Sequence, residues 1–198
     1  MAMLEQRIQQ QFFDSADLQY QSAESLARPI ADAAQALTGC LTAGGKVLAA
    51  GFGGAAALAQ HFCATFVGRF ERERPGLAAV ALAADSSLLG TLATQDGIDQ
   101  VFAKQVQALG QGGDVLLLID AMGSPGALAA SIEAAHARDM VVVVLGRRTA
   151  APGPALGETD VQVVVPHERP ARVLELQLLV LHCLCDAVDL QLMGEQEP

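Results

Sequence analysis

The sequence predicts a doubly wound α/β sandwich built on a five-stranded parallel sheet. Five short segments are apolar, with Gln162 as the single polar residue among them, as in parallel strands that are covered on both faces. The segments between them are long enough to form the helices that cross over between parallel strands. With 198 residues, 52% of them hydrophobic, the chain can bury both faces of such a sheet. The predicted strands are residues 47–50, 77–83, 115–119, 141–145 and 161–165.

The segment before the first strand carries apolar residues at helical spacing. We expect two N-terminal helices, over residues 3–27 and 31–43, because Pro29 interrupts the pattern and Gly44 and Gly45 end it. The same spacing recurs between the strands and predicts the crossover helices. These helices are expected over residues 55–66, 86–94, 98–109 and 127–137.

Residues 169–193 predict a long C-terminal helix that is apolar around most of its circumference. One face of a sheet can cover only part of such a helix, so we expect the remainder to pack against other subunits. Leu184, Val188 and Leu192 are the residues expected to form this oligomerisation helix. Charged side chains interrupt the segment too often for a membrane span.

Composition and charge exclude several classes of protein. The net charge of −10 argues against direct nucleic-acid binding, which needs a cationic face. The four cysteines include no C-x-x-C pair, so neither a disulfide framework nor a zinc knuckle is expected. The sequence contains neither a secretory leader pattern nor an apolar run long enough to span a membrane. We therefore expect a cytoplasmic protein with one domain over 1–198, composed of a helical segment (1–45) and an α/β core (46–198).

Residues 46–69 have the layout of a phosphate-binding strand, loop and helix. Gly51, Gly53 and Gly54 predict a tight turn, and the N–H groups that begin the next helix would point into it. Ala55 is the first helical residue and is followed by further alanines, so neither a hydroxyl nor a lysine adds to the backbone dipoles. The turn therefore predicts an anion site that depends on the backbone alone.

A second loop, residues 120–126, should meet the first one at the carboxyl ends of the strands, where doubly wound sheets bind ligands. Asp120 would place a carboxylate near the anion, at a cost of about 1 to 4 kcal/mol at ~4 Å. Met122 offers no hydrogen bond and Pro125 lacks an N–H, which leaves Ser124 as the hydroxyl donor. The two loops thus predict a degenerate phosphate pocket.

Several strings of residues, in this order and spacing, resemble the SIS-domain proteins of the phosphoheptose isomerase group over nearly the whole chain. They are KVLAAGFGG, GRFERERPG, AKQVQALG, GDVLLLID and CLCDAVD. The resemblance implies a flavodoxin-like αβα sandwich and a homo-oligomer, expected to be a tetramer. Within the group, RFERERPGLAAVAL and CLCDAVD are most similar to the DiaA branch of DnaA initiator-associating proteins, which are not isomerases.

The resemblance also implies where the isomerase branch carries its functional groups. These are serines in both loops, a His and a Glu one turn apart on the helix after the first loop, and a Gln and a His on the last helix. This chain lacks the serines at the matching positions; it keeps His61 and His182 but has Thr65 and Leu174 in place of Glu and Gln. No carboxylate then remains as general base, and two histidines hold a metal only weakly. We therefore assign neither catalytic nor metal residues and expect zinc only if the chain is an isomerase.

Two interpretations of His61 and His182 stay open. They are either a relic acid–base or metal pair, or two helix histidines that are satisfied by their neighbours, and the second interpretation is preferred. The degenerate sugar-phosphate pocket is the other candidate site. Its residues are expected to be Gly51, Gly53, Gly54, Ala55, Asp120 and Ser124.

The missing groups favour a non-catalytic regulatory protein that, like DiaA, binds the initiator DnaA and promotes replication initiation. A symmetric oligomer suits this role because it raises the effective concentration of its bound partners. Two alternatives remain. One is a sedoheptulose 7-phosphate isomerase, that is, a phosphoheptose isomerase, and the other is a sensor that binds a sugar phosphate without reacting.

Overall fold

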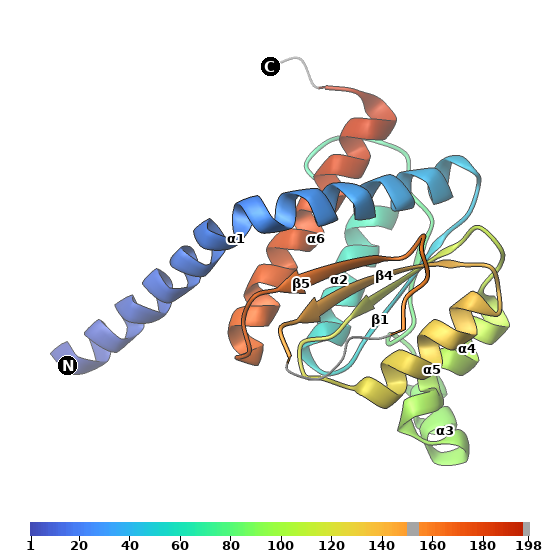
Figure 1. The fold of residues 1–198 in the computed structure, drawn as a ribbon, viewed down its shortest axis with the longest axis horizontal. Coiled ribbons are helices and arrows are strands. Elements are labelled where there is room, and N and C mark those ends of the chain that lie inside the picture. Colours follow the sequence, from blue (N-terminus) through green and yellow to red (C-terminus); the bar gives the residue numbers. More distant parts are fainter. Residues whose placement is uncertain (150–154, 196–198) are drawn as a thin grey trace.

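The structure is a computed structural model that describes residues 1–149 and 155–195. In chain order its elements are α1 (Ala2–Thr42), β1 (Val47–Gly51), α2 (Gly54–Val67), β2 (Ala79–Ala81), α3 (Ser86–Asp96), the 3-10 turn η1 (Ile98–Gln100), α4 (Val101–Leu109), β3 (Val115–Ile119), α5 (Pro125–His136), β4 (Val141–Arg147), β5 (Val161–Val165) and α6 (Pro170–Met193). The sheet forms the middle of three layers (Figure 1). Among the described residues, no helix is both long and apolar enough to cross a membrane.

All neighbouring strands are parallel, in the order β2-β1-β3-β4-β5. This confirms the predicted doubly wound sandwich. From β1 the chain adds β2 on one side and then builds β3, β4 and β5 outward on the other, so the order reverses between β1 and β3. That reversal is where ligands bind in sheets of this kind. The edge strand β2 pairs over only part of the predicted 77–83, because it has a neighbour on one side alone.

Alternate residues of each strand face different helical layers, as the two-residue period of a strand requires. Val47, Val115 and Val143 belong to the core under α1, α2 and α6. Leu48, Leu116 and Val142 belong to the core under α4 and α5. The continuous apolar runs therefore reflect two cores, one on each face of the sheet.

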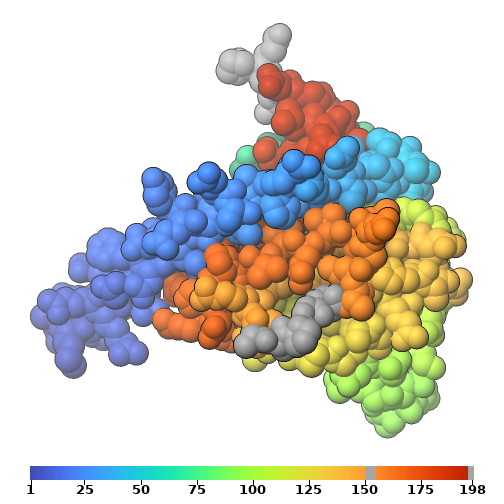
Figure 2. Space-filling model, viewed as in Figure 1, coloured from blue at the N-terminus to red at the C-terminus, as the bar shows by residue number. Residues whose placement is uncertain are grey.

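The N-terminal segment differs from the prediction, because α1 is one helix of 41 residues that continues through Pro29. Proline removes one backbone hydrogen bond but does not have to end a helix whose tertiary packing continues on both sides. Leu26, Ala33 and Leu37 are buried on either side of it, in contact with the core shared with α6. The first half of α1 extends away from the body of the molecule as an arm (Figures 1 and 2).

The apolar circumference of α6 is covered largely within the chain. α1 packs across one side of the helix and α2 packs on another (Figure 1). As a result, Leu184 and Val188 are fully buried and Leu192 is half-buried against the same core. For Leu184 and Val188 the expectation that they face other subunits is corrected, because α1 and α2 already cover them within the chain.

Candidate functional site

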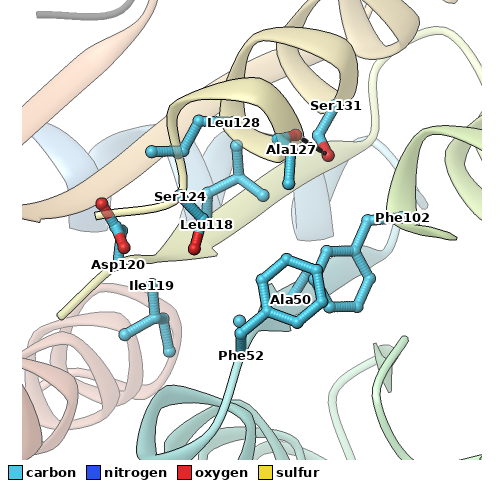
Figure 3. Close-up of a pocket in the computed structure, with 11 residues that line it drawn as sticks. Ala50, Phe52, Phe102, Leu118, Ile119, Asp120, Ser124, Ala127, Leu128 and Ser131 are labelled. Carbon is cyan, nitrogen blue, oxygen red and sulfur yellow. Dashed lines mark hydrogen bonds between the residues drawn. The ribbon is translucent and has the colours of Figure 1, made fainter. Parts of the chain in front are cut away.

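Two loops meet at the carboxyl ends of β1 and β3 and form a small cleft between them. Figure 3 shows Asp120, Ser124 and Leu128 on one side of the cleft and Phe52 and Phe102 on the other. The cavity volume is about 20 Å³, room for about one water molecule. The cavity is therefore too small to enclose a ligand of the size of a sugar phosphate.

The first loop forms the predicted tight turn at the start of α2. Gly53 has φ 57° and ψ −124°, a conformation that side chains other than hydrogen rarely adopt. The N–H groups of Ala55 and Ala56 donate to the carbonyls of Phe52 and Gly53, so the turn itself uses two of the donors that could have held an anion.

An apolar side chain from α6 covers the same turn. A Cβ atom built on Gly54 would lie 2.7 Å from Leu174 Cδ1, which means that Leu174 packs directly on the backbone at the start of α2. On the other side of the turn, the rings of Phe52 and Phe102 have centroids 4.5 Å apart. The first loop is therefore apolar on both sides, and Leu174 takes a packing role where the isomerase branch is expected to carry a Gln.

The second loop differs from the prediction in the direction of its carboxylate. The Gly123 N–H donates to Asp120 Oδ1 at 2.8 Å, so Asp120 binds its own loop. Ser124 is the N-cap residue of α5, and its side chain makes no capping hydrogen bond. The second loop therefore keeps a hydroxyl at a helix N-terminus, where negative charge is stabilised. The expected repulsion between Asp120 and an anion is reduced, because an N–H neutralises part of the charge.

Arg147, which the sequence analysis did not single out, packs against this loop from the end of β4. A Cβ atom built on Gly123 would lie 2.9 Å from Arg147 Nη2, and φ of Gly123 is +83°, so glycine is required for this contact. Arg147 Nε is buried and has no hydrogen-bond partner among the described residues. The sequence feature that could have pointed to Arg147 is its place directly at the carboxyl end of a continuously apolar strand.

The two histidines come from different helices and meet. His61 on α2 and His182 on α6 have their Nε2 atoms 2.9 Å apart, and one ring donates its N–H to the other. The rings are roughly perpendicular, with centroids 5.1 Å apart, and Phe70 lies against His182. The pair is accessible, since His61 is exposed and His182 is half-buried. The histidines are thus satisfied by each other, which leaves both interpretations from the sequence compatible with their geometry.

Thr65, one turn after His61, is occupied elsewhere. Its hydroxyl donates to the Phe62 carbonyl at 2.8 Å and lies 3.3 Å from Cys185 Sγ. Burial raises the pKa of the Cys185 thiol to about 11, although the Thr65 hydrogen bond opposes this shift. Burial also raises the pKa of Cys63 to about 12, with a further contribution from Cys185. These thiols are neutral at physiological pH and are neither nucleophiles nor metal ligands in this form.

The donor set does not fit the zinc ion that the resemblance implies. Catalytic zinc sites typically use three protein ligands. Across residues 1–149 and 155–195, no group of three or more His, Cys, Asp and Glu side chains is placed to hold a metal ion. His61 and His182 bind each other, whereas Thr65 and Leu174 add neither a nitrogen nor a carboxylate.

Comparison with known proteins identifies the family. The SIS domain family matches residues 11–146, more than half of the chain. The chain belongs to the SIS domain family. The SIS-type αβα sandwich expected from the sequence is thereby confirmed, and the cleft between the two loops lies in the part of the chain that the family match covers.

This SIS domain protein is similar over its full length to proteins named phosphoheptose isomerase. The one from Methylibium petroleiphilum is 59% identical over 198 residues, which covers 100% of this chain and 99% of the relative. The one from Azoarcus sp. is 50% identical over 192 residues, which cover 96% of this chain and 98% of the relative. The solved structure of phosphoheptose isomerase GmhA from Neisseria gonorrhoeae is 40% identical in sequence, with a TM-score of 0.86. The match covers 94% of this chain and 98% of that one. The structure of a phosphoheptose isomerase from Francisella tularensis is 36% identical, with a TM-score of 0.87, and the match covers 96% of this chain and 99% of that one.

These similarities correct two expectations from the sequence. Full-length relatives at 59% and 50% identity carry the name of an enzyme, so the interpretation as a non-catalytic, DnaA-binding protein is wrong, as is the inclination against an enzyme. The error came from the weight given to Thr65 and Leu174. Replacing two side chains of a site does not remove the remaining two, and His61 and His182 still meet at 2.9 Å.

Proposed function

We propose that this protein is a phosphoheptose isomerase, which interconverts sedoheptulose 7-phosphate and an aldoheptose phosphate. The observation that carries the proposal is the 59% identity to a protein of that name over the whole of both chains. The paired histidines support it, because they supply groups able to exchange protons on an accessible surface. The four cysteines of the sequence, free in the structure, are compatible with a cytoplasmic enzyme.

The reaction requires a base and an acid that act on adjacent carbon and oxygen atoms. A proton leaves the carbon next to the carbonyl, an enediol forms, and a proton returns to the former carbonyl carbon. Imidazole is the side chain best suited to take up and release protons near neutral pH. In the His61–His182 pair one Nε2 carries the shared hydrogen and the other carries the lone pair, so a neutral pair offers one acid and one base.

These proton transfers would pass through His61 and His182. Thr65 has no carboxylate that could act as the base, and its hydroxyl is hydrogen-bonded to the Phe62 carbonyl. The substrate would have to separate or bridge the two rings, since each Nε2 atom now faces the other. The phosphate end of the substrate would lie at the carboxyl ends of the strands, as in other doubly wound folds.

Turnover of sedoheptulose 7-phosphate by the purified protein, followed by NMR, tests the proposal. We expect conversion by the wild type, and a fall in kcat of about 10² to 10⁴ in His61→Gln and in His182→Gln, because glutamine keeps a hydrogen bond but transfers no proton. His167→Asn is the matched control: His167 lies before α6 and accepts a hydrogen bond from the Arg169 N–H, which asparagine can also do. Absence of conversion by the wild type, or full activity in both glutamine variants, would reject the proposal.

A further inference from the structure

Arg147 occupies the ligand side of the sheet by virtue of strand register. Ile119 pairs with Leu145 across β3 and β4, and the Asp120 N–H donates to the Leu145 carbonyl at 2.9 Å. Gln177, fully buried on α6, donates to the carbonyls of Leu145 and Asp120 and so fixes both strand ends. Arg147, two residues beyond Leu145, is thereby held beside the second loop.

The guanidinium of Arg147 is packed but unused. It lies against Gly123, where an added Cβ atom would come within 2.9 Å of Nη2, and its Nε is buried without a hydrogen-bond partner among the described residues. None of the ion pairs found in residues 1–149 and 155–195 includes Arg147. Arg74 and Arg172 pair with carboxylates in this chain of net charge −10. Nε of Arg72 and of Arg172 also lacks a partner, but both guanidiniums donate from Nη1 to a backbone carbonyl, whereas no described hydrogen bond includes the Arg147 guanidinium. Buried N–H groups without partners are rare in folded proteins, which points to a ligand.

The surroundings of Arg147 favour an oxyanion. A guanidinium presents donors in a planar fork that matches the oxygens of a phosphate. Asp120, the carboxylate of the adjacent loop, is directed to the Gly123 N–H and forms no ion pair with Arg147 among the described contacts. On the same loop, Ser124 offers a hydroxyl at the N-terminus of a 12-residue helix.

We propose that Arg147 binds the phosphate group of the substrate at the loop of residues 120–124. In this chain the arginine thus adds to Ser124, the one serine of the loop, and acts as a positioning residue at the anionic end. The identity of the sugar rests on the proposed isomerase function, whereas the binding of a phosphate group does not. Gly123 is part of the same arrangement, because its missing side chain makes room for the guanidinium.

Calorimetry with inorganic phosphate and with sedoheptulose 7-phosphate tests this proposal. Arg147→Gln should weaken the binding of both ligands by about tenfold or more, the effect of removing a charged hydrogen-bond donor. The neighbouring Arg148→Gln is the matched control, since Arg148 is exposed and should leave both affinities unchanged. In turnover, Arg147→Gln should raise KM far more than it lowers kcat.

Arg147→Lys covers the case in which Arg147→Gln does not fold. Lysine keeps the positive charge and the aliphatic stem but lacks the planar fork, so it should bind both ligands more weakly than the wild type and more tightly than glutamine. Wild-type affinity in Arg147→Gln, or in Arg147→Lys if the first variant is unfolded, would overturn the proposal, and so would a wild type that does not bind phosphate. A wild type that binds phosphate through Arg147 but converts no heptose phosphate would reject the isomerase function alone.

Discussion

The four histidines of the chain differ in what their rings contact. His136 binds the Asp160 carboxylate at 2.7 Å, and the same carboxylate accepts from the N–H groups of Val142 and Gly157. His167 accepts from a backbone N–H near the start of α6. Only in the pair of His61 and His182 does the Nε2 atom of one imidazole face the Nε2 atom of another. At the scale of residues, this difference is why the proposed chemistry is assigned to this pair.

Removal of metal ions should not affect turnover. Because the described residues provide no third ligand beside His61 and His182, we expect kcat to be unchanged after dialysis against EDTA and after addition of zinc. The measurement is turnover together with the metal content of the active sample by mass spectrometry. One zinc ion per chain, with activity lost on its removal and regained on its return, would contradict the assignment.

The buried thiols of Cys63 and Cys185 predict a loss of stability at alkaline pH. Their pKa values in the folded state, about 12 and about 11, lie above the ordinary 9.0. At pH values between 9 and these values the folded chain therefore binds more protons than the unfolded chain. Stability is therefore complete below pH 9 and falls as pH rises above it. We expect the free energy of unfolding to drop by about 2 kcal/mol for each thiol from pH 9 to pH 11.

Urea denaturation at a series of pH values measures this effect, and the matched control is the double variant Cys63→Ala, Cys185→Ala. The variant keeps all other alkaline titrations of the chain but lacks the two thiols, so its stability should fall less steeply over the same range. Equal slopes in the two proteins would show that the thiols do not contribute.

At the scale of elements, a buried ion pair holds α6 to the segment after α2, beside a hydrogen bond from Arg72 to the Gly194 carbonyl. Arg74 Nε lies 2.5 Å from Asp189 Oδ1, and both side chains are almost completely buried. The same guanidinium also donates to the carbonyls of Phe66 and Thr65 at the end of α2. Arg74 therefore joins α2 and α6, the two helices that carry His61 and His182.

Asp189→Asn should destabilise the protein by about 3 to 5 kcal/mol, because it leaves the buried charge of Arg74 without its partner. Asp32→Asn is the control, since the pair of Asp32 with Arg28 is exposed and should contribute about 0.5 kcal/mol or less. Urea denaturation at neutral pH measures both variants. Similar small losses in the two would show that the buried pair is not important for stability.

The sequence was sufficient to predict most elements, and its errors have physical causes. The runs 115–119 and 161–165 became strands with these bounds: the first is buried on both faces, whereas the edge strand 161–165 buries Val163 and Val165 and exposes Gln162 and Val164. Pro29 suggested a helix end, but contacts made by distant residues of α6 and β5 keep α1 continuous. These contacts are not visible in the local pattern on which the prediction was based.

For the site, the sequence predicted both loops and the two histidines, but not which side chains meet. The contact of Arg147 with Gly123 depends on strand register and on φ of one glycine, and neither can be read from composition or spacing. The Nε2–Nε2 contact likewise depends on how α2 and α6 cross. That Thr65 and Leu174 replace a Glu and a Gln of the isomerase branch stays a prediction from the resemblance, and it says little about the chemistry of His61 and His182.

At the scale of the whole molecule, the arm formed by the first half of α1 is covered only in part within a single chain, where Gln11 and Ser15 contact the start of α6. Figure 2 shows it extending from the body, and several of its large apolar side chains are exposed. They are Met3, Leu4, Ile8, Phe12, Phe13 and Tyr20. An isolated helical arm of this length is marginal in water, so we propose that second copies of the chain cover it in a homotetramer.

Light scattering should give the mass of a tetramer, with each chain contributing 20.5 kDa. Phe12→Glu should reduce that mass, because Phe12 is 70% exposed on the arm and glutamate cannot be buried there without a partner. Ile98→Glu is the matched control: Ile98 is 59% exposed, but it lies on η1, far from α1. A monomeric wild type, or equal masses for the wild type and Phe12→Glu, would contradict this assembly.

Proton transfer by the two histidines of a phosphoheptose isomerase is tested most directly by the incorporation of deuterium during isomerisation in D₂O. Imidazole N–H groups exchange with solvent, so a proton taken from the substrate carbon should be replaced by deuterium before it returns. We expect deuterium at the carbon that was the carbonyl carbon of the substrate. In His61→Gln and in His182→Gln, both turnover and the incorporation of deuterium should be lost. Product without carbon-bound deuterium would contradict proton transfer through the pair, and absence of product would contradict the isomerase itself.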